Sequence, residues 1–210
     1  MADATDPDAD LMLRAKQDDR GAFEELVVRH QQAVINFIYR SVPDLSEAED
    51  LTQNTFVQAW KARQRYQVSA KFTTWLFTIA RNLTLNELRR RSRHQHDSID
   101  APAGDDEAQP ARQFEDHTAN SAAEDILRGE IEQRVAEAVG DLPENQRTAI
   151  LLCQDEDVSY EEIAKVLGCS LSATKSVIFR ARETLKLRLK AYLHSGDWAQ
   201  GSSATFPKPR

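Results

Sequence analysis

The segment from Ser159 to Arg182, SYEEIAKVLGCSLSATKSVIFRAR, constrains the fold of this chain more than any other. Ser159 and Glu162 form a capping box, in which a hydroxyl and a carboxylate satisfy backbone N–H groups that a starting helix leaves unpaired. Apolar residues then recur at helical spacing up to Leu167. Gly168 stands where this helix must end, because glycine adopts the left-handed conformation without a Cβ clash. The segment therefore predicts two helices joined by a short turn.

The second helix of this segment is predicted to have one apolar and one basic side. Ser170 or Ser172 can cap it. Its apolar side comprises Val177, Ile178, Ala181 and Leu185, and its outward side comprises Lys175, Ser176, Phe179, Arg180 and Arg182. A basic helix after such a turn is typical of a helix-turn-helix that enters the DNA major groove. An ordinary helical hairpin with solvated charges is the alternative that the segment alone leaves open.

The distribution of charge favours a polyanionic partner although the net charge of the 210 residues is −7. Residues 61–93 hold nine Lys and Arg against one acid, and residues 165–190 hold seven against one. Between them, residues 94–127 hold nine Asp and Glu against one Arg. The local field of a basic segment, and not the net charge, attracts nucleic acid.

The sequence gives little support for a bound cofactor, a metal site or a membrane-spanning segment. Cys153 and Cys169 form neither a CxxC pair nor a zinc spacing, and their apolar helical surroundings predict buried, reduced thiols. The N-terminal MADATDPDAD lacks the basic and apolar regions of a signal peptide, and no apolar run is long enough to span a bilayer. We therefore expect a cytoplasmic protein without cofactor, metal or membrane insertion.

Two helices in the N-terminal half carry patterned outward faces. Ser46 and Glu49 predict a capping box that opens the helix SEAEDLTQNTFVQAWKAR, with Phe56 and Trp60 as core residues or interface anchors. A polar row on that helix comprises Asp50, Gln53, Asn54, Val57 and Lys61, and a solvated surface is its simplest explanation. Thr73 or Thr74 is expected to cap a helix over about 74–93. Its outward row comprises Trp75, Asn82, Asn86, Arg89 and Arg93.

The outward row of the 74–93 helix suits single-stranded nucleic acid. An aromatic ring can stack on an unpaired base, amides can contact base edges and arginines neutralise phosphates. A core tryptophan beside a basic surface is the alternative. His30, at the edge of an apolar helical face, is expected to be packed and hydrogen-bonded, since no other ligand type lies at metal spacing.

The chain is predicted to be all-α, with two small helical domains joined by a flexible acidic linker. The linker carries few large apolar residues, many acids, and Pro102, Gly104 and Pro110. The expected divisions are a disordered tail at 1–9, a first domain at 10–93, the linker at 94–124, a second domain at 125–193 and a flexible tail at 194–210.

The order of four motifs resembles sigma-70 family transcription initiation factors of the small extracytoplasmic-function type. The motifs are AFEELVVRHQQAVINFIYR at 22–40, AEDLTQNTFVQAW at 48–60, FTTWLFTIARNLTLNELRRR at 72–91, and LPENQRTAILLCQDEDVSYEEIAKVLGCSLSATKSVIFRARE at 142–183. The resemblance implies sigma domain 2 at 10–93 and sigma domain 4 at 125–193. It also implies core RNA polymerase and promoter DNA as partners, and allows an anti-sigma factor.

The resemblance assigns three sets of site residues. Polymerase binding falls to Asp50, Gln53, Asn54, Phe56 and Trp60. Capture of melted −10 bases falls to Tyr66, Phe72, Trp75, Asn82, Asn86, Arg89 and Arg90. Reading of the −35 duplex falls to Thr174, Lys175, Ser176, Phe179, Arg180 and Arg182. The segment LSATKSV at 171–177 departs from the family pattern at Ala173, Thr174 and Val177, so the −35 preference is expected to differ.

The sequence is compatible with three functional classes. A transcription initiation factor uses both domains. A stand-alone helix-turn-helix regulator would use only the second domain, and an anti-sigma-binding decoy would bind a protein without initiating transcription. An enzyme has the least support, because neither a phosphate-cradling glycine-rich loop nor a nucleophile and base pair can be recognised.

Overall fold

All regular structure in the described part of the chain is helical. The computed structural model describes residues 6–68, 70–97, 122–154 and 158–195. Its elements are α1 (Pro7–Lys16), α2 (Arg20–Tyr39), α3 (Leu45–Ala62), a 3₁₀ turn η1 (Arg63–Arg65), α4 (Phe72–Asp97), α5 (Ala122–Gly140), α6 (Glu144–Leu152), α7 (Tyr160–Leu167) and α8 (Leu171–Ser195). The predicted all-α class is confirmed for these residues.

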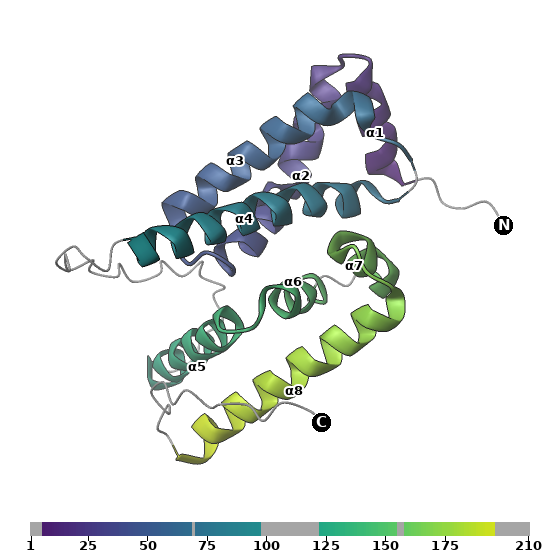
Figure 1. Cartoon of the computed structure of the whole chain (residues 1–210). Coiled ribbons are helices and arrows are strands. Elements are labelled where there is room, and N and C mark those ends of the chain that lie inside the picture. The colour runs from purple at the N-terminus through teal and green to yellow at the C-terminus, as the bar shows by residue number, and fades with distance from the viewer. Residues whose placement is uncertain (1–5, 69, 98–121, 155–157, 196–210) are drawn as a thin grey trace.

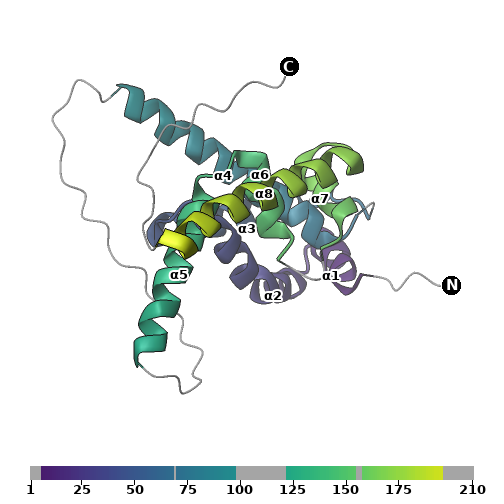
Figure 2. The same cartoon turned by 90° about the horizontal axis from the view of Figure 1, so that it is seen from below.

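The helices form two groups that lie against each other. Figure 1 shows α1 to α4 in one group and α5 to α8 in the other, with α6 and α7 next to α4. The C-terminal end of α4 extends beyond the packed helices (Figure 2). On the C-terminal half of this helix, Arg89, Arg90 and Arg93 are exposed.

One apolar core runs through both groups of helices. In the first group it is filled by fully buried side chains such as Met12, Leu26, Ile38 and Leu76. It continues into the second group through residues of α6, α7 and α8, including Ile163. Burial of such aliphatic side chains contributes about 1.5–3 kcal/mol each. The two groups are therefore held together by hydrophobic packing as well as by polar contacts.

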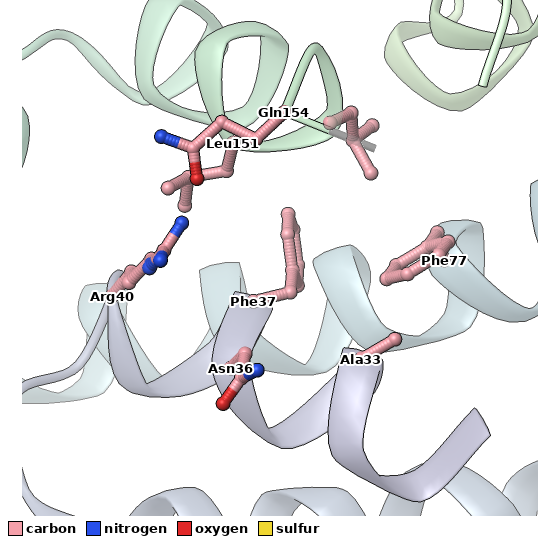
Figure 3. Close-up of a pocket in the computed structure, with 8 residues that line it drawn as sticks. Ala33, Asn36, Phe37, Arg40, Phe77, Leu151 and Gln154 are labelled. Atoms are coloured by element: carbon pink, nitrogen blue, oxygen red, sulfur yellow. The ribbon is translucent and has the colours of Figure 1, made fainter. Parts of the chain in front are cut away.

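Phe37 of α2 and Phe77 of α4 form the apolar centre of the seam between the groups. Their rings meet edge to face at a centroid distance of 5.5 Å. Beside them lies a small cavity of about 160 Å³ whose opposite wall includes Leu151 and Gln154. Figure 3 shows Phe37 pointing from α2 towards Leu151 of the second group, with Arg40 at the rim.

Polar contacts cross the seam at its two ends. Arg147 of α6 donates to the carbonyl oxygen of Ser41 at 3.2 Å and to that of Leu142 at 3.1 Å, and it also contacts the Gly140 carbonyl. Lys71 pairs with Glu162 at 3.4 Å. Burial lowers the pKa of the Arg147 guanidinium, but an arginine remains charged. The half-buried Arg147 thus ties three backbone carbonyls of both groups to one cation.

Several predicted helix boundaries are wrong. The predicted capping box of Ser46 and Glu49 does not form, because α3 begins at Leu45 and Asp44 is its cap, accepting from the Glu47 N–H at 3.0 Å. Helix α4 begins at Phe72, before either expected cap, Thr73 or Thr74.

Some residues expected in the tails and the linker belong to helices. Helix α1 begins at Pro7 and buries Ala9, so the tail expected over 1–9 is wrong for its last residues, and 1–5 lie outside the described residues. Residues 94–97 belong to α4 and residues 122–124 to α5, while 98–121 are not described. Of the expected tail at 194–210, the first two residues continue α8 and the rest is not described.

The helices that the structure describes include none with the length and apolar content needed to cross a lipid bilayer.

Candidate nucleic-acid interface

The turn between α7 and α8 has the geometry that its sequence predicts. The Ser159 hydroxyl accepts from the Glu162 N–H at 3.3 Å, and the Glu162 carboxylate accepts from the Ser159 N–H at 2.7 Å. Gly168 ends α7 with φ 67°, in the left-handed region. Ser170 caps α8, with its hydroxyl accepting from the Ala173 N–H at 3.2 Å. The predicted helix-turn-helix is therefore present, with Ser170 and not Ser172 as the cap.

The basic row of α8 is exposed. Ile178 and Ala181 are buried and hold the opposite side of α8 against the second group. The exposed residues of the row are Lys175, Ser176, Phe179, Arg180 and Arg182, and 66% of Phe179 is accessible. Within the described ranges, no carboxylate pairs with Lys175, Arg180 or Arg182. Their charges are therefore available to a polyanion.

Thr174, predicted among the −35 residues, is fully buried. Its hydroxyl donates to the Ser170 carbonyl at 3.1 Å and lies 3.2 Å from the Cys169 sulfur. It therefore secures the first turn of α8 from inside the fold.

Cys169 is exposed in the turn, so the prediction that both thiols are buried is wrong for it. Cys153 is half-buried, and this burial raises the pKa of its thiol.

The second basic row lies on α4. Asn82, Asn86, Arg89 and Arg93 are all exposed on this helix. Arg90, predicted to contact −10 DNA, is instead engaged by carboxylates: it pairs with Glu87 at 2.7 Å and with Glu47 of α3 at 3.7 Å. Arg91 also pairs with Glu47. Arg89 and Arg93 are therefore more available for phosphates than Arg90.

An aromatic cluster lies at the N-terminal end of the α4 row. Tyr66 meets Trp75 with a ring centroid distance of 5.3 Å and Phe72 at 6.3 Å. Tyr66 is 1% accessible and Phe72 is fully buried, while Trp75 is half-buried. The three residues predicted for base capture are thus brought together, but the ring of Tyr66 is covered. A base could stack on it only after the side chain moves.

The hydroxyl of Tyr66 is buried without a hydrogen-bond partner among the described residues. Burial, followed by the negative charges of Asp6 and Asp8, raises its pKa to about 12. An unpaired buried hydroxyl costs about 1–3 kcal/mol. The buried position of this side chain therefore lacks a hydrogen bond that the hydroxyl would make in water, and this offsets part of the energy needed to move it.

Replacing Tyr66 with Phe is expected to raise the free energy of unfolding at pH 7 by about 1–3 kcal/mol, because the unpaired hydroxyl is removed. The raised pKa means that the wild type holds its full Tyr66 contribution below pH 10 and loses it as the pH rises through about 12. The loss of stability across this range should be smaller in Tyr66→Phe. Urea unfolding near pH 10 and near pH 12 measures this loss of stability. Tyr39→Phe, at a half-buried tyrosine, is the control.

The exposed side of α3 forms a third surface. Asp50, Gln53 and Asn54 are exposed beside Val57, as the polar row predicts. Phe56 is buried in the core, so it cannot contact a partner without rearrangement. Trp60 is half-buried, 5.1 Å from the ring of Phe23, and the Arg63 guanidinium stacks on it at 4.1 Å.

Residues that sequence reasoning missed hold the aromatic cluster in place. The carboxylate of Asp6 accepts from the Phe72 N–H at 2.9 Å, and the ammonium of Lys16 donates to the Tyr66 carbonyl at 2.8 Å. His30 is packed and hydrogen-bonded, as expected, at 2.7 Å from Asp8 and 5.4 Å from the Phe72 ring. The pair Asp6–Pro7 is a helix-start signal that could have placed α1 correctly. No local signal predicts the contact with Phe72.

Together, the fold and these faces define a helical DNA-binding protein with a helix-turn-helix in its second group of helices. The family description "Sigma-70 region 2" matches residues 26–94, and "Sigma-70, region 4" matches residues 132–185. These two matches cover the α4 row and the helix-turn-helix respectively.

Curated relatives match nearly the whole chain. The RNA polymerase sigma-H factor of Pseudomonas aeruginosa is 37% identical over 190 residues, which are 89% of this chain and 95% of the relative. The ECF RNA polymerase sigma-E factor of Escherichia coli K12 is 34% identical over 179 residues, 83% of this chain and 90% of the relative. The chain therefore belongs to the sigma-70 family of RNA polymerase sigma factors, and within it to the extracytoplasmic-function type. It is a transcription initiation factor and not an enzyme.

Two solved structures are similar over both groups of helices. The structure of CnrH in complex with the cytosolic domain of CnrY has a TM-score of 0.63 at 27% identity and covers 88% of this chain and 97% of that one. The sigma factor RpoE in complex with the anti-sigma factor NepR from Bartonella quintana has a TM-score of 0.61 at 28% identity, over 80% of this chain and 96% of that one.

Proposed function

We propose that this initiation factor directs core RNA polymerase to its promoters through three separate surfaces. The exposed side of α3 around Asp50, Gln53 and Asn54 binds the polymerase. The α4 row captures unpaired bases of the −10 element, with Tyr66, Phe72 and Trp75 as the stacking cluster. The outward side of α8 reads the −35 duplex.

The observation that carries the proposal is the unpaired basic row on α8. Arg180 and Lys175 are exposed beside an accessible aromatic ring, on a helix that follows a capped, left-handed turn. An acidic side chain paired with Lys175 or Arg180 would have to be displaced before DNA could bind. None of the described residues forms such a pair. The side chains can therefore reach base edges and phosphates without breaking an internal ion pair.

The energy for strand opening would come from binding alone. Stacking of an unpaired base on an aromatic side chain contributes about 1–3 kcal/mol. Arg89 and Arg93 add phosphate neutralisation beside the cluster. This combination favours the single-stranded state of the −10 element over the duplex, and it needs no nucleotide hydrolysis.

An anti-sigma factor is the regulatory partner that fits this proposal. RpoE, which shares the fold over most of this chain, was solved with the anti-sigma factor NepR. A purified anti-sigma factor that recognises this chain is expected to compete with core polymerase. Binding to such a factor without any stimulation of transcription would support the decoy alternative instead.

The test is run-off transcription with core polymerase and a library of genomic promoter fragments, followed by sequencing of the transcribed templates. The expected result is enrichment of fragments that share a −35 and a −10 element. Absence of promoter-specific stimulation at low salt would refute the proposal. Tight binding to a palindromic duplex without core polymerase would indicate the stand-alone regulator.

A further inference from the structure

Helix α1 packs on the segment that leads into the α4 row, although it precedes the residues matched by the region 2 family description. It contacts α2, α4 and η1. In Figure 1 it lies at the end of the first group where α4 begins. Helix α1 therefore lies beside the aromatic cluster of the −10 surface.

The carboxylate of Asp6 caps two helices at once. One oxygen accepts from the Asp8 N–H at 3.1 Å, which caps α1 itself. The other accepts from the Phe72 N–H at 2.9 Å. That N–H belongs to the first turn of α4, where backbone donors have no partner within the helix and the helix dipole favours a negative charge. Asp6 therefore satisfies an otherwise unpaired N–H at the start of α4.

The opposite end of α1 holds the beginning of the same segment. The Lys16 ammonium donates to the Tyr66 carbonyl at 2.8 Å, and the Gln64 amide donates to the Lys16 carbonyl at 2.8 Å. Arg63 pairs with Asp18, just beyond α1. The connection from η1 to α4 is thus fixed at both ends by the two ends of one helix.

These contacts act on the backbone and leave the Tyr66 side chain without a hydrogen bond. The Tyr66 carbonyl is bound by Lys16, but its buried hydroxyl has no partner in the described part of the chain. The ring is therefore held only by packing, against Phe72 and Trp75 among others, while its backbone is held by a hydrogen bond. A fixed backbone reduces the conformational entropy that base binding must otherwise overcome.

We propose that α1 positions the −10 capture cluster, with Asp6 and Lys16 as its positioning residues. The inference rests on the proposed function, since it requires that the cluster of Tyr66, Phe72 and Trp75 receives a base. Neither positioning residue touches DNA. Each acts through the backbone atom that it binds, at Phe72 and Tyr66 respectively.

The variants separate the capping of α4 from the folding of α1. Asp6→Asn keeps one oxygen acceptor for the Asp8 N–H and loses the second for Phe72, whereas Asp6→Ala loses both. Lys16→Met removes the donor to Tyr66 and retains a long apolar stem. Asp10→Asn is the matched control, because Asp10 is an exposed acid on the same helix and its carboxylate makes no hydrogen bond or ion pair in the described structure.

The experiment measures binding of polymerase carrying each variant to forked promoter DNA, using a promoter recovered by the transcription selection. In this DNA the non-template strand of the −10 element is single-stranded. A series of such DNAs carries one abasic site each, at successive −10 positions. At the captured position the wild type should lose about tenfold or more in affinity, the factor that corresponds to about 1.4 kcal/mol of lost stacking. Asp6→Asn and Lys16→Met should lose about as much on intact DNA, because each removes a charge-assisted hydrogen bond.

The decisive result is whether the loss of affinity at the abasic site differs between the variants and the wild type. If Asp6 and Lys16 position the cluster, the abasic site should cost the variants much less than it costs the wild type or Asp10→Asn. A purely structural role would weaken intact and abasic DNA by the same factor, and this outcome would overturn the inference alone. If the wild type shows no penalty at any abasic position, the proposed −10 capture itself fails and the inference fails with it.

Discussion

Replacing Arg180 with alanine is expected to weaken −35 binding by the polymerase complex by about 1–3 kcal/mol, the usual loss for a base-reading arginine. Arg180 is exposed on α8 and has no acidic partner in the described structure, so its donors are available to a base edge. Fluorescence anisotropy with −35 duplexes, over a series of salt concentrations and single base changes, measures the effect. The variant should also lose discrimination at one −35 position.

Lys190→Ala is the matched control for this prediction. Lys190 is exposed on the same helix, ten residues or about 15 Å along the axis from Arg180, and its removal changes the charge equally. A uniform loss for all sequences, with a salt slope lower by about one, would indicate that Arg180 binds a phosphate instead of a base. Equal losses for both variants would contradict any reading role for Arg180.

The −10 surface is best tested with Asn82→Ala beside Arg180→Ala. Asn82 is exposed, whereas Tyr66 is buried, and truncating a buried aromatic would cost about 3–5 kcal/mol of folding stability. Asn82→Ala is expected to preserve −35 duplex binding and to reduce promoter opening, measured by permanganate reactivity of melted thymines. If the two variants behave alike in this assay, the proposed division between α4 and α8 is wrong.

Replacing Arg147 with alanine should destabilise the packed arrangement of the two helix groups. Arg147 binds carbonyls of Ser41, Gly140 and Leu142, and a hydrogen bond from a charged group is worth about 1.5–3 kcal/mol. We expect a loss of this order in urea unfolding and an increase of the radius of gyration in small-angle X-ray scattering. Arg188→Ala, which removes a surface pair with Asp141, should cost less than about 1 kcal/mol.

The Arg147 variant also bears on how the factor would engage a promoter. The positions that name the −35 and −10 elements differ by about 25 base pairs, which is about 85 Å along a duplex at about 3.4 Å per base pair. Helix α4 has 26 residues, about 39 Å, and it packs directly on α7 of the helix-turn-helix. The packed arrangement is too short to serve both elements, so the proposed function requires the seam to open. A weakened seam should therefore speed assembly with core polymerase, and unchanged assembly would argue against this requirement.

Local features of the sequence predicted local structure well. The box of Ser159 and Glu162, the left-handed Gly168 and the cap at Ser170 all involve groups within a few residues of each other. Their hydrogen bonds depend little on the rest of the chain. The spacing of apolar residues likewise predicted that Ile178 and Ala181 lie on the buried side of α8, because helical periodicity is fixed by the backbone.

Predictions failed both where a neighbouring residue competes for a backbone group and where a distant one does. Asp44, two residues before Ser46, caps α3 in its place, whereas Asp6 reaches Phe72 across 66 positions of the chain. Tyr66 was assigned to the same −10 set as Trp75, but its burial depends on how the segment after η1 folds against α1. Thr174 lies on the buried side of α8 because α7 and the Cys169 turn cover it.

The sequence by itself determined the all-helical class, the helix-turn-helix and the two basic rows, because these follow from local hydrogen bonding and periodicity. Only the tertiary structure decided that α1 holds the aromatic cluster, that Glu47 engages Arg90 while Arg89 stays available, and that Arg147 joins the two groups. These contacts join residues far apart in the chain. Their geometry is set by the packing of the common core, which no local pattern specifies.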